Sequence, residues 1–329
     1  MEIYNYVIND NKQIPPYFDK ESICFLDIET TGLNKNKSYI YLLGILYFDF
    51  NNSRWCITQY FVDRIEKEEK LLSRFNNFIK RFKTIVTFNG ESFDIPFIKH
   101  RINRYKIKHS LDCLESFDIY RKIKEESSFI KLKNYKLKTI EESLGIYRDD
   151  RISGKECIDL YYQYKKSKEK NLLDMILKHN HDDLYYLLDI LKIFDVINKA
   201  KTIYIRNDEE LIKAEIKSIS TKGDMFNILC TVSKPNNIVY FGEYFNIRWD
   251  DNKLFINLEH KEGLVTPTKK CLFVDISSWN INGWLKDSSE YVIPDNIILL
   301  KVEEKYEMDN LKKIIEEKIG KRAYRSHSK

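Results

Sequence analysis

The sequence predicts an α/β fold, in which a mixed sheet flanked by helices is followed by a smaller β-rich domain, and two patterns carry this prediction. Over the first two-thirds of the chain, short apolar runs bounded by turn formers alternate with segments of helical periodicity. After about residue 205 the pattern becomes the apolar–polar alternation of half-buried strands. We therefore expect an N-terminal arm over 1–20, an α/β domain over 21–199, a β-rich domain of open role over 205–320 and a basic tail over 321–329.

The order of elements in the first domain favours a mixed sheet. Three apolar runs with short connections predict a three-strand meander over 22–28, 39–50 and 55–62. A further buried strand over 84–88 is ended by Asn89-Gly90. Apolar residues at helical spacing, opposite a charged face, predict helices over 66–81, 96–105, 137–144, 156–165 and 171–198, and a strand followed by a helix is expected within 111–122.

The second domain is expected to be built mainly of strands. Alternating patterns over 212–275 predict about five of them. The turn formers Asp250-Asp251-Asn252 predict a hairpin between 245–249 and 253–259. A helix over 308–319 precedes the basic tail, whose cations either add non-specific affinity for a polyanion or are disordered: Lys321, Arg322, Arg325 and Lys329.

Composition limits the classes of protein that fit. Aromatic residues make up 14% of the 329 residues, which argues against a disordered chain. No apolar run approaches the roughly 20 residues that span a bilayer, and the first residues lack a signal-peptide pattern, so we expect a cytoplasmic protein without a membrane segment. The six cysteines form no C-x-x-C pair, which excludes a zinc ribbon and a dithiol redox motif, and we interpret them as small buried apolar residues.

The first group of candidate site residues lies in the segment Phe25–Leu33, FLDIETTGL. Successive side chains of a strand alternate between its faces, so Asp27 and Glu29 should project the same way. Two neighbouring carboxylates repel each other unless a cation neutralises them, and the Thr-Thr-Gly that follows lets the chain turn beside them. Such hard oxygen ligands suit Mg²⁺ or Mn²⁺ rather than zinc. The alternative is an exposed strand end with solvated acids.

A second group, TFNGESFD over Thr87–Asp94, follows the strand expected at 84–88. Asn89 and Asp94 would lie at the carboxyl end of this strand and in the turn after it, where ligand sites of α/β sheets usually form. The alternative is a capped helix start, with Ser92 or Asp94 as the N-cap residue.

The third group, KHNHDDLYY over Lys178–Tyr186, lies inside an expected amphipathic helix. His179 and Asp183 are four residues apart and therefore share one helical face, whereas His181 and Asp182 point elsewhere. The alternative is an ordinary polar helix face.

Taken in order, these three groups resemble the three motifs of the DEDD exonuclease superfamily, which has the ribonuclease-H-like fold. Residues 137–164, LKTIEESLGIYRDDRISGKECIDLYYQY, are similar to the segment that the bacterial YprB-type branch carries before its third motif. The resemblance covers roughly residues 20–195 and leaves the β-rich remainder unplaced. It implies a 3′→5′ exonuclease whose four carboxylates are Asp27, Glu29, Asp94 and Asp183.

The resemblance also implies a mechanism with two divalent ions, Mg²⁺ or Mn²⁺. Asp27 would bridge both ions, Glu29 and Asp183 would complete one site, and Asp94 would hold the other. His179 stands at the spacing that tyrosine has in one branch, with three residues between it and Asp183, and acts either as general base or as a group that orients water. The substrate contacts implied are Thr30, Thr31, Gly32, Leu33 and Asn89.

Residues 99–138 hold twelve Lys or Arg against five Asp or Glu, in a chain of net charge +5. A basic segment is typical of a polyanion-binding surface, and Tyr120, Phe129 and Tyr135 are candidates to stack on bases, although core packing is the commoner role of such residues. The expected partner is nucleic acid, with a single-stranded 3′ end of DNA or RNA as the substrate. A structure-specific endonuclease, a proofreading subunit and a non-catalytic nucleic-acid-binding module are the alternatives.

Overall fold

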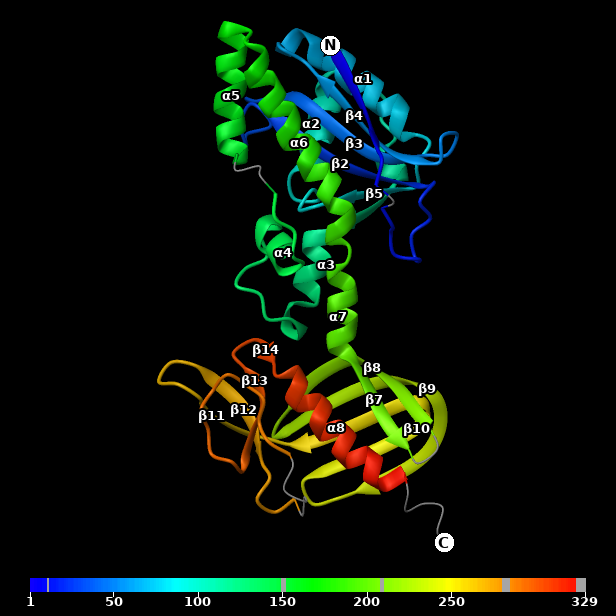
Figure 1. Ribbon diagram of the computed structural model, residues 1–329, viewed down its shortest axis with the longest axis vertical. Coiled ribbons are helices and arrows are strands. Elements are labelled where there is room, and N and C mark those ends of the chain that lie inside the picture. Colours follow the sequence, from blue (N-terminus) through cyan, green and yellow to red (C-terminus); the bar gives the residue numbers. More distant parts are fainter. Residues whose placement is uncertain (11, 149–151, 208–209, 280–284, 324–329) are drawn as a thin grey trace. The chain divides into compact units, whose positions relative to one another are not determined.

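The computed structural model describes residues 1–10, 12–148, 152–207, 210–279 and 285–323 (Figure 1). The chain forms two compact units. The first unit contains Met1–Glu125 and Leu132–Ile193, and the second contains Glu126–Lys131 and Phe194–Lys329. The short segment 126–131 therefore belongs to the second unit, which differs from the single division near residue 200 that the sequence predicts.

A six-stranded mixed sheet with the order β1-β4-β3-β2-β5-β6 forms the centre of the first unit. Its first four strands in this order pair antiparallel, and β2, β5 and β6 pair parallel. The predicted mixed sheet and its meander are confirmed. The strands are β1 (Glu2–Ile8), β2 (Ile23–Thr30), β3 (Ile40–Asp49), β4 (Arg54–Phe61), β5 (Thr84–Thr87) and β6 (Glu115–Asp118).

The structure differs from the expected N-terminal arm over 1–20. The strand β1 pairs with β4 along its whole length, from Glu2 opposite Phe61 to Ile8 opposite Trp55. Because β1 lies at the edge of the sheet, most of its side chains are exposed or half-buried, and the segment lacks the apolar run that marks the central strands.

Helices cover both faces of this sheet. Tyr47 of β3 packs against Phe78 of α1, whereas Gly44 of the same strand lies under Asn180 of α6, and residues an odd number apart in a strand face opposite sides. Figure 1 shows α6 running across the strands that it contacts, β2, β3 and β4. The helices of the first unit are α1 (Glu68–Ile79), α2 (Asp94–Arg104), α3 (Ile119–Glu125), α4 (Leu137–Ser143), α5 (Gly154–Ser167) and α6 (Lys170–Ile190). The next helix, α7 (Ile193–Lys201), belongs to the second unit from its second residue on.

A glycine allows α6 to lie close to the sheet. A Cβ built on Gly44 would overlap Oδ1 of Asn180 and would lie 2.5 Å from Cδ1 of Leu184, which is closer than real Cβ atoms approach. Gly44 pairs with Asp27 across β3 and β2, so the close approach occurs beside the first candidate carboxylate. The close packing of α6 on the sheet therefore depends on the absence of a side chain at residue 44.

We expect Gly44→Ala to destabilise the protein by about 1–3 kcal/mol, since the added methyl group has no free volume. Denaturant unfolding of the full chain measures this change. Gly154→Ala is the matched control, because a Cβ at Gly154 meets nothing within 4 Å. Equal stability of the two variants would show that α6 has room to move away from the sheet.

A buried ion pair joins α1 and α2. Glu68 and Arg101 are 0% and 1% exposed, and their side chains form a salt bridge. One oxygen of Glu68 also accepts the backbone N–H of Ile40 at 2.9 Å, at the start of β3, and the other accepts the hydroxyl of Tyr105 at 2.9 Å. The pair ties both helices to the sheet.

The second unit consists of two antiparallel sheets and one long helix (Figure 1). One sheet has the order β10-β9-β8-β7 and the other β11-β12-β13-β14, and α8 contacts β7 and β13. The elements are β7 (Thr202–Asn207), β8 (Glu210–Lys222), β9 (Met225–Phe241), β10 (Phe245–Glu259), β11 (Lys261–Leu264), β12 (Lys270–Asp275), β13 (Ile297–Val302), β14 (Lys305–Tyr306) and α8 (Met308–Ala323).

The predicted hairpin at Asp250-Asp251-Asn252 is wrong. The strand β10 continues through these residues and pairs with β9 on both sides of them. Asp251 has a φ of 52°, and the register shifts between Asp251 and Lys253, so the turn formers produce a bulge instead of a reversal. The predicted tail residues Arg325 and Lys329 lie outside the described residues.

Within the described ranges, no helix combines the length and the apolar character that crossing a bilayer requires.

Candidate active site

Three carboxylates from two elements meet on one face of the central sheet. Asp27 and Glu29 come from β2, and Asp183 comes from α6, and one oxygen of each lies within 4.8 Å of the others. The sequence prediction that Asp27 and Glu29 share a face agrees with this arrangement. Asp94, the first residue of α2, is buried and accepts the backbone N–H of Ile28 at 3.1 Å.

Asn180 fixes the side chain of Asp27. Its Nδ2 donates to Oδ2 of Asp27 at 2.6 Å, and its Oδ1 accepts from Nε2 of Gln59 at 2.8 Å. Gln59 in turn donates to the carbonyl of Leu177 at 2.9 Å, which ties β4 to α6. The sequence analysis did not single out Asn180, although its place between two histidines in an apolar helix is a signal that could have found it.

His179 lies between two of the carboxylates. Its Nε2 is 3.5 Å from Oε1 of Glu29 and 3.8 Å from Oδ2 of Asp183, so the imidazole and Asp183 share a helical face as predicted. His181 and Asp182 point elsewhere, also as predicted: Asp182 pairs with Lys178 and with Nδ1 of His181.

Burial and the clustering of acids raise the pKa values of two of these carboxyl groups. Burial, followed by the negative charges of Asp183, Asp94 and Glu29, raises the pKa of Asp27 well above its ordinary range. Burial, together with the nearby acids, raises the pKa of Asp94 to about 7, against the lowering effect of the N–H donated by Ile28. A bound cation would remove this repulsion, and carboxylate oxygens are the ligands that hard divalent ions prefer. The donor set therefore fits Mg²⁺ or Mn²⁺.

Arg148 and Glu141 are site residues that the sequence analysis missed. Nη1 of Arg148 pairs with Asp183, and its Nε and Nη2 each lie 2.9 Å from an oxygen of Glu141. All three residues line the same cavity. The arginine stands in the stretch that resembles the YprB-type branch, but neither its type nor its spacing marks it out from the sequence.

Three of the four candidate carboxylates, but not Asp94, line a cavity of about 1380 Å³ in the first unit. It brings together Asp27, Glu29, His179 and Asp183 with two of the predicted substrate residues, Thr30 and Leu33. Leu33 is 82% exposed, so an apolar side chain stands free at the cavity. The other walls carry aromatic and basic side chains, among them Phe93, Tyr147, Lys136, Lys138 and Lys155.

Three predicted substrate residues do not line this cavity. Thr31 accepts the N–H of Tyr39 at 3.1 Å, and Gly32 lies against Ser38, so both shape the turn after β2. Asn89 is exposed with a φ of 63°. Its N–H and that of Glu91 are held by Asp118, at 2.9 and 3.0 Å, so Asp118 orders the loop after β5.

The proposed stacking residues have protein partners. Tyr120 packs edge-on against Phe88 with ring centroids 5.8 Å apart, and the Nζ of Lys124 lies 4.8 Å from the centroid of Tyr135. Phe129 belongs to the second unit, where it packs against Tyr306. The segment 99–138 is therefore divided between the two units.

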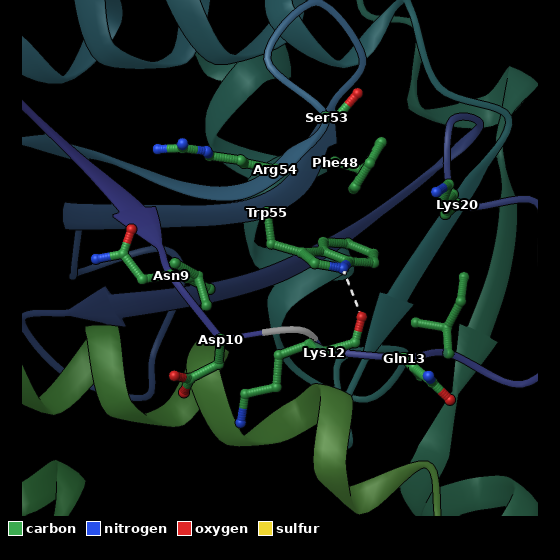
Figure 2. Close-up of a pocket in the computed structure, with 11 residues that line it drawn as sticks. Asn9, Asp10, Lys12, Gln13, Lys20, Phe48, Ser53, Arg54 and Trp55 are labelled. Atoms are coloured by element: carbon green, nitrogen blue, oxygen red, sulfur yellow. Dashed lines mark hydrogen bonds between the residues drawn. The ribbon is translucent and has the colours of Figure 1, made fainter.

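A second cavity of the first unit, of about 550 Å³, lies away from these carboxylates (Figure 2). It is lined by residues of the chain start and of β3 and β4, including Lys20, Phe48, Arg54 and Trp55. Figure 2 shows Nε1 of Trp55 donating to the carbonyl of Lys12, at 3.2 Å. The ammonium of Lys12 pairs with Asp189 and lies 3.8 Å from the ring centroid of Tyr185, which ties the chain start to α6.

The six-stranded mixed sheet, with α6 across it and acids at its central strand, defines a nuclease-type fold of the ribonuclease H kind. The chain belongs to the RNase H superfamily, whose family model matches residues 24–194. This confirms the ribonuclease-H-like fold that the motifs predict.

The chain is 29% identical over 177 residues to the uncharacterized protein YprB of Bacillus subtilis (strain 168). The match covers 53% of this chain and 42% of that protein, so the chain spans less than half of that relative. Among solved structures, it is similar to the family B DNA polymerase of the archaeon Pyrobaculum calidifontis, with a TM-score of 0.40 and 17% identity over 54% of this chain and 25% of that one. It is also similar to E. coli ExoI in an ssDNA complex, with a TM-score of 0.34 and 10% identity. That match covers 64% of this chain and 54% of the ExoI chain.

Proposed function

We propose that this protein is a metal-dependent 3′→5′ exonuclease of the DEDD type, which hydrolyses phosphodiester bonds of DNA or RNA. The observation that carries the proposal is the meeting of Asp27, Glu29 and Asp183 within 4.8 Å in a large cavity that His179 also lines. Asp94 is held beside them by its hydrogen bond from the backbone N–H of Ile28. Such a cluster is costly in a folded protein without a cation to neutralise it.

Asp27, Glu29 and Asp183 would hold one divalent ion, and Asp27 with Asp94 would hold a second. When bound, the two ions would supply an activated water and neutralise charge on the departing oxygen. His179 would accept the proton of the attacking water, since its Nε2 lies 3.5 Å from Glu29 and 3.8 Å from Asp183, the residues that would hold the ion. Asn180 keeps the carboxylate of Asp27 in one orientation through its 2.6 Å hydrogen bond.

The walls of the cavity suit a nucleic-acid end. Lys136, Lys138 and Lys155 supply positive charge for phosphates, and Leu33 offers an exposed apolar side chain on which a terminal base can pack. Thr30 lines the cavity beside the carboxylates. The direction of degradation, from the 3′ end, and a single-stranded substrate are taken from the DEDD resemblance.

Incubation with linear and with circular single strands of the same sequence distinguishes the proposed exonuclease from an endonuclease. With Mg²⁺ or Mn²⁺ we expect shortening of linear DNA or RNA and no loss of the circle. Cleavage of the circle would instead establish an endonuclease, which the ribonuclease-H-like fold also supports. Tight binding with no cleavage of any strand would favour a non-catalytic binding module.

The raised acid pKa values predict how stability depends on pH. In the metal-free folded protein Asp94 keeps its proton up to about pH 7, whereas in the unfolded chain it loses it near its ordinary value of 3.8. The folded state then binds more protons over this window, so the free energy of unfolding should fall as pH rises from about 4 to about 7. Bound Mn²⁺ should reverse the trend, because the carboxylates bind it in their ionised form.

Thermal denaturation at about pH 5 and about pH 8, with Mn²⁺ and with EDTA, measures this linkage. We expect the stabilisation by Mn²⁺ to be larger at the higher pH. Stabilisation that is equal at both values, or absent, would contradict metal binding by these acids.

A further inference from the structure

Cys157, on α5, places its thiol beside two residues of the candidate active site. Its Sγ, the imidazole of His179 and the carboxylate of Glu29 offer three ligand atoms that lie within 4.8 Å of one another, and all three residues are buried. Nothing in the proposed exonuclease mechanism uses this thiol. Its Sγ accepts a hydrogen bond from the hydroxyl of Tyr41, at 3.4 Å.

We propose that Glu29, Cys157 and His179 form a binding site for a thiophilic divalent cation of the Zn²⁺ class, which overlaps the site for Mg²⁺ or Mn²⁺ and inhibits the enzyme when occupied. One thiolate, one imidazole and one carboxylate are a donor set that favours Zn²⁺ over the hard ions, which prefer oxygen alone. The site goes beyond the proposed function in its ligand, and its inhibitory effect rests on that function.

The distances between the ligand atoms fit this ion. With bonds of about 2.0–2.3 Å in a tetrahedral arrangement, ligand atoms stand roughly 3.3–3.8 Å apart. Nε2 of His179 and Oε1 of Glu29 are already 3.5 Å apart. The sulfur therefore has to approach the other two ligand atoms by at most about 1 Å when the ion binds. Water would complete the four ligands, as in other open zinc sites.

The cation has a route to this site. Glu29 and His179 line the cavity, and so do Ser153, Gly154 and Ile158 at the start of the helix that carries Cys157. Burial, followed by the charge of Glu29, raises the pKa of the Cys157 thiol, so the sulfur carries its proton before the ion arrives. Coordination replaces that proton, which leaves to solvent, and no electron is transferred.

Occupation of this site would disable catalysis without blocking the cavity. Glu29 is proposed as a ligand of the catalytic ion and His179 as the acceptor of the water proton, and Zn²⁺ would take both. Mg²⁺ competes for Glu29, but the thiolate and the imidazole favour Zn²⁺, so inhibition should appear even in the presence of saturating Mg²⁺.

Cobalt(II) is the probe that tests binding independently of activity, because it takes zinc sites and gives a sulfur-to-cobalt charge-transfer absorption only with a thiolate ligand. We expect this band to rise to one equivalent of cobalt in the metal-free full chain, and Zn²⁺ to abolish it. Cys157→Ser should lose the band at nearly unchanged side-chain volume. Cys113→Ala should keep it, because Cys113 is exposed on the surface. A wild-type chain without the band, or a band that survives in Cys157→Ser, would overturn the site.

The second measurement tests inhibition. Zinc is titrated into the Mg²⁺-supported nuclease reaction, and the rate of each variant is compared with its own zinc-free rate. We expect Cys157→Ser to need at least about ten-fold more zinc for half inhibition, a change worth about 1.4 kcal/mol, and Cys113→Ala to need the same amount as wild type. Equal sensitivity of Cys157→Ser would overturn the inhibitory role. A chain that cleaves no substrate would contradict the proposed function, while the cobalt band would still decide the site.

Discussion

Replacing Asp27 with Asn is expected to lower the rate of metal-dependent hydrolysis by about 1000-fold or more. Asp27 lies at the centre of the cluster, within 4.8 Å of the oxygens of Glu29 and Asp183, and it is the residue proposed to contact both ions. Losing its charge would remove several kcal/mol of stabilisation from the reaction, at about 1.4 kcal/mol per tenfold in rate. Single-turnover cleavage of a labelled single strand in Mn²⁺ measures the effect.

The same substitution, which lowers activity, is not expected to lower the stability of the metal-free protein. Because burial, followed by the charges of neighbouring acids, raises the pKa of Asp27, the charge of Asp27 opposes folding in the absence of metal. We therefore expect Asp27→Asn to be at least as stable as wild type in EDTA, and to gain little from Mn²⁺. Asp182→Asn is the matched control, since Asp182 is on α6 but pairs with Lys178 and does not line the cavity. If Asp27→Asn were as active as the control, Asp27 could not be a ligand of the catalytic ions.

Breaking the buried pair of Glu68 and Arg101 is expected to be the most damaging change to stability. Arg101→Met would leave a fully buried carboxylate without its cation, at a cost of about 3–5 kcal/mol. Among the described residues, the hydrogen bonds that remain to stabilise the charge come from the N–H of Ile40 and the hydroxyl of Tyr105. Since Arg101 is on the helix that begins with Asp94, activity should fall with stability.

A double-mutant cycle isolates the pair. Arg101→Met combined with Glu68→Gln should recover part of the loss, because no unpaired charge remains buried. Lys122→Ala removes an exposed pair with Glu125, 47% and 52% exposed, and should change the free energy of unfolding by less than about 1 kcal/mol. Urea denaturation compares the wild type, Arg101→Met, Glu68→Gln, the double variant and Lys122→Ala. A loss for Arg101→Met as small as that of Lys122→Ala would contradict the burial of the pair.

The part of the fold that the sequence predicts well is the part with strong periodicity. The strands that carry Asp27 and Val86 are buried on both sides and stand out as apolar runs, and α1 and α6 show helical spacing. The edge strand β1 has no such run, because exposure allows polar residues along it. Residues 126–131 belong to the second unit through contacts between residues that are far apart in sequence, such as the salt bridge of Lys131 with Glu307, whose N and O atoms are 2.6 Å apart. No local sequence pattern encodes such contacts.

The candidate site divides in the same way. The spacing of Asp27 and Glu29, and that of His179 and Asp183, predicts which side chains share a face. The partners that fix them come from other elements: Asn180 bonds to Asp27 because Gly44 lets α6 lie close to the sheet. Arg148 pairs with Asp183 although the two residues are 35 apart in sequence, so no local pattern predicts this contact either. The alternation of side chains in strands and the periodicity of helices identify the candidate ligands from the sequence. The residues that position those ligands can be identified only from the folded structure.

The measurement that tests the central claim most directly is a time course of 5′-labelled single-stranded DNA and RNA with wild type and Asp27→Asn, in Mn²⁺ and in EDTA. A ladder that shortens from the 3′ end in Mn²⁺ with wild type, and not with EDTA or with Asp27→Asn, is the result that the account predicts. Release of the 5′ label as a mononucleotide at the earliest times, or degradation that continues in EDTA, would contradict a metal-dependent 3′→5′ exonuclease.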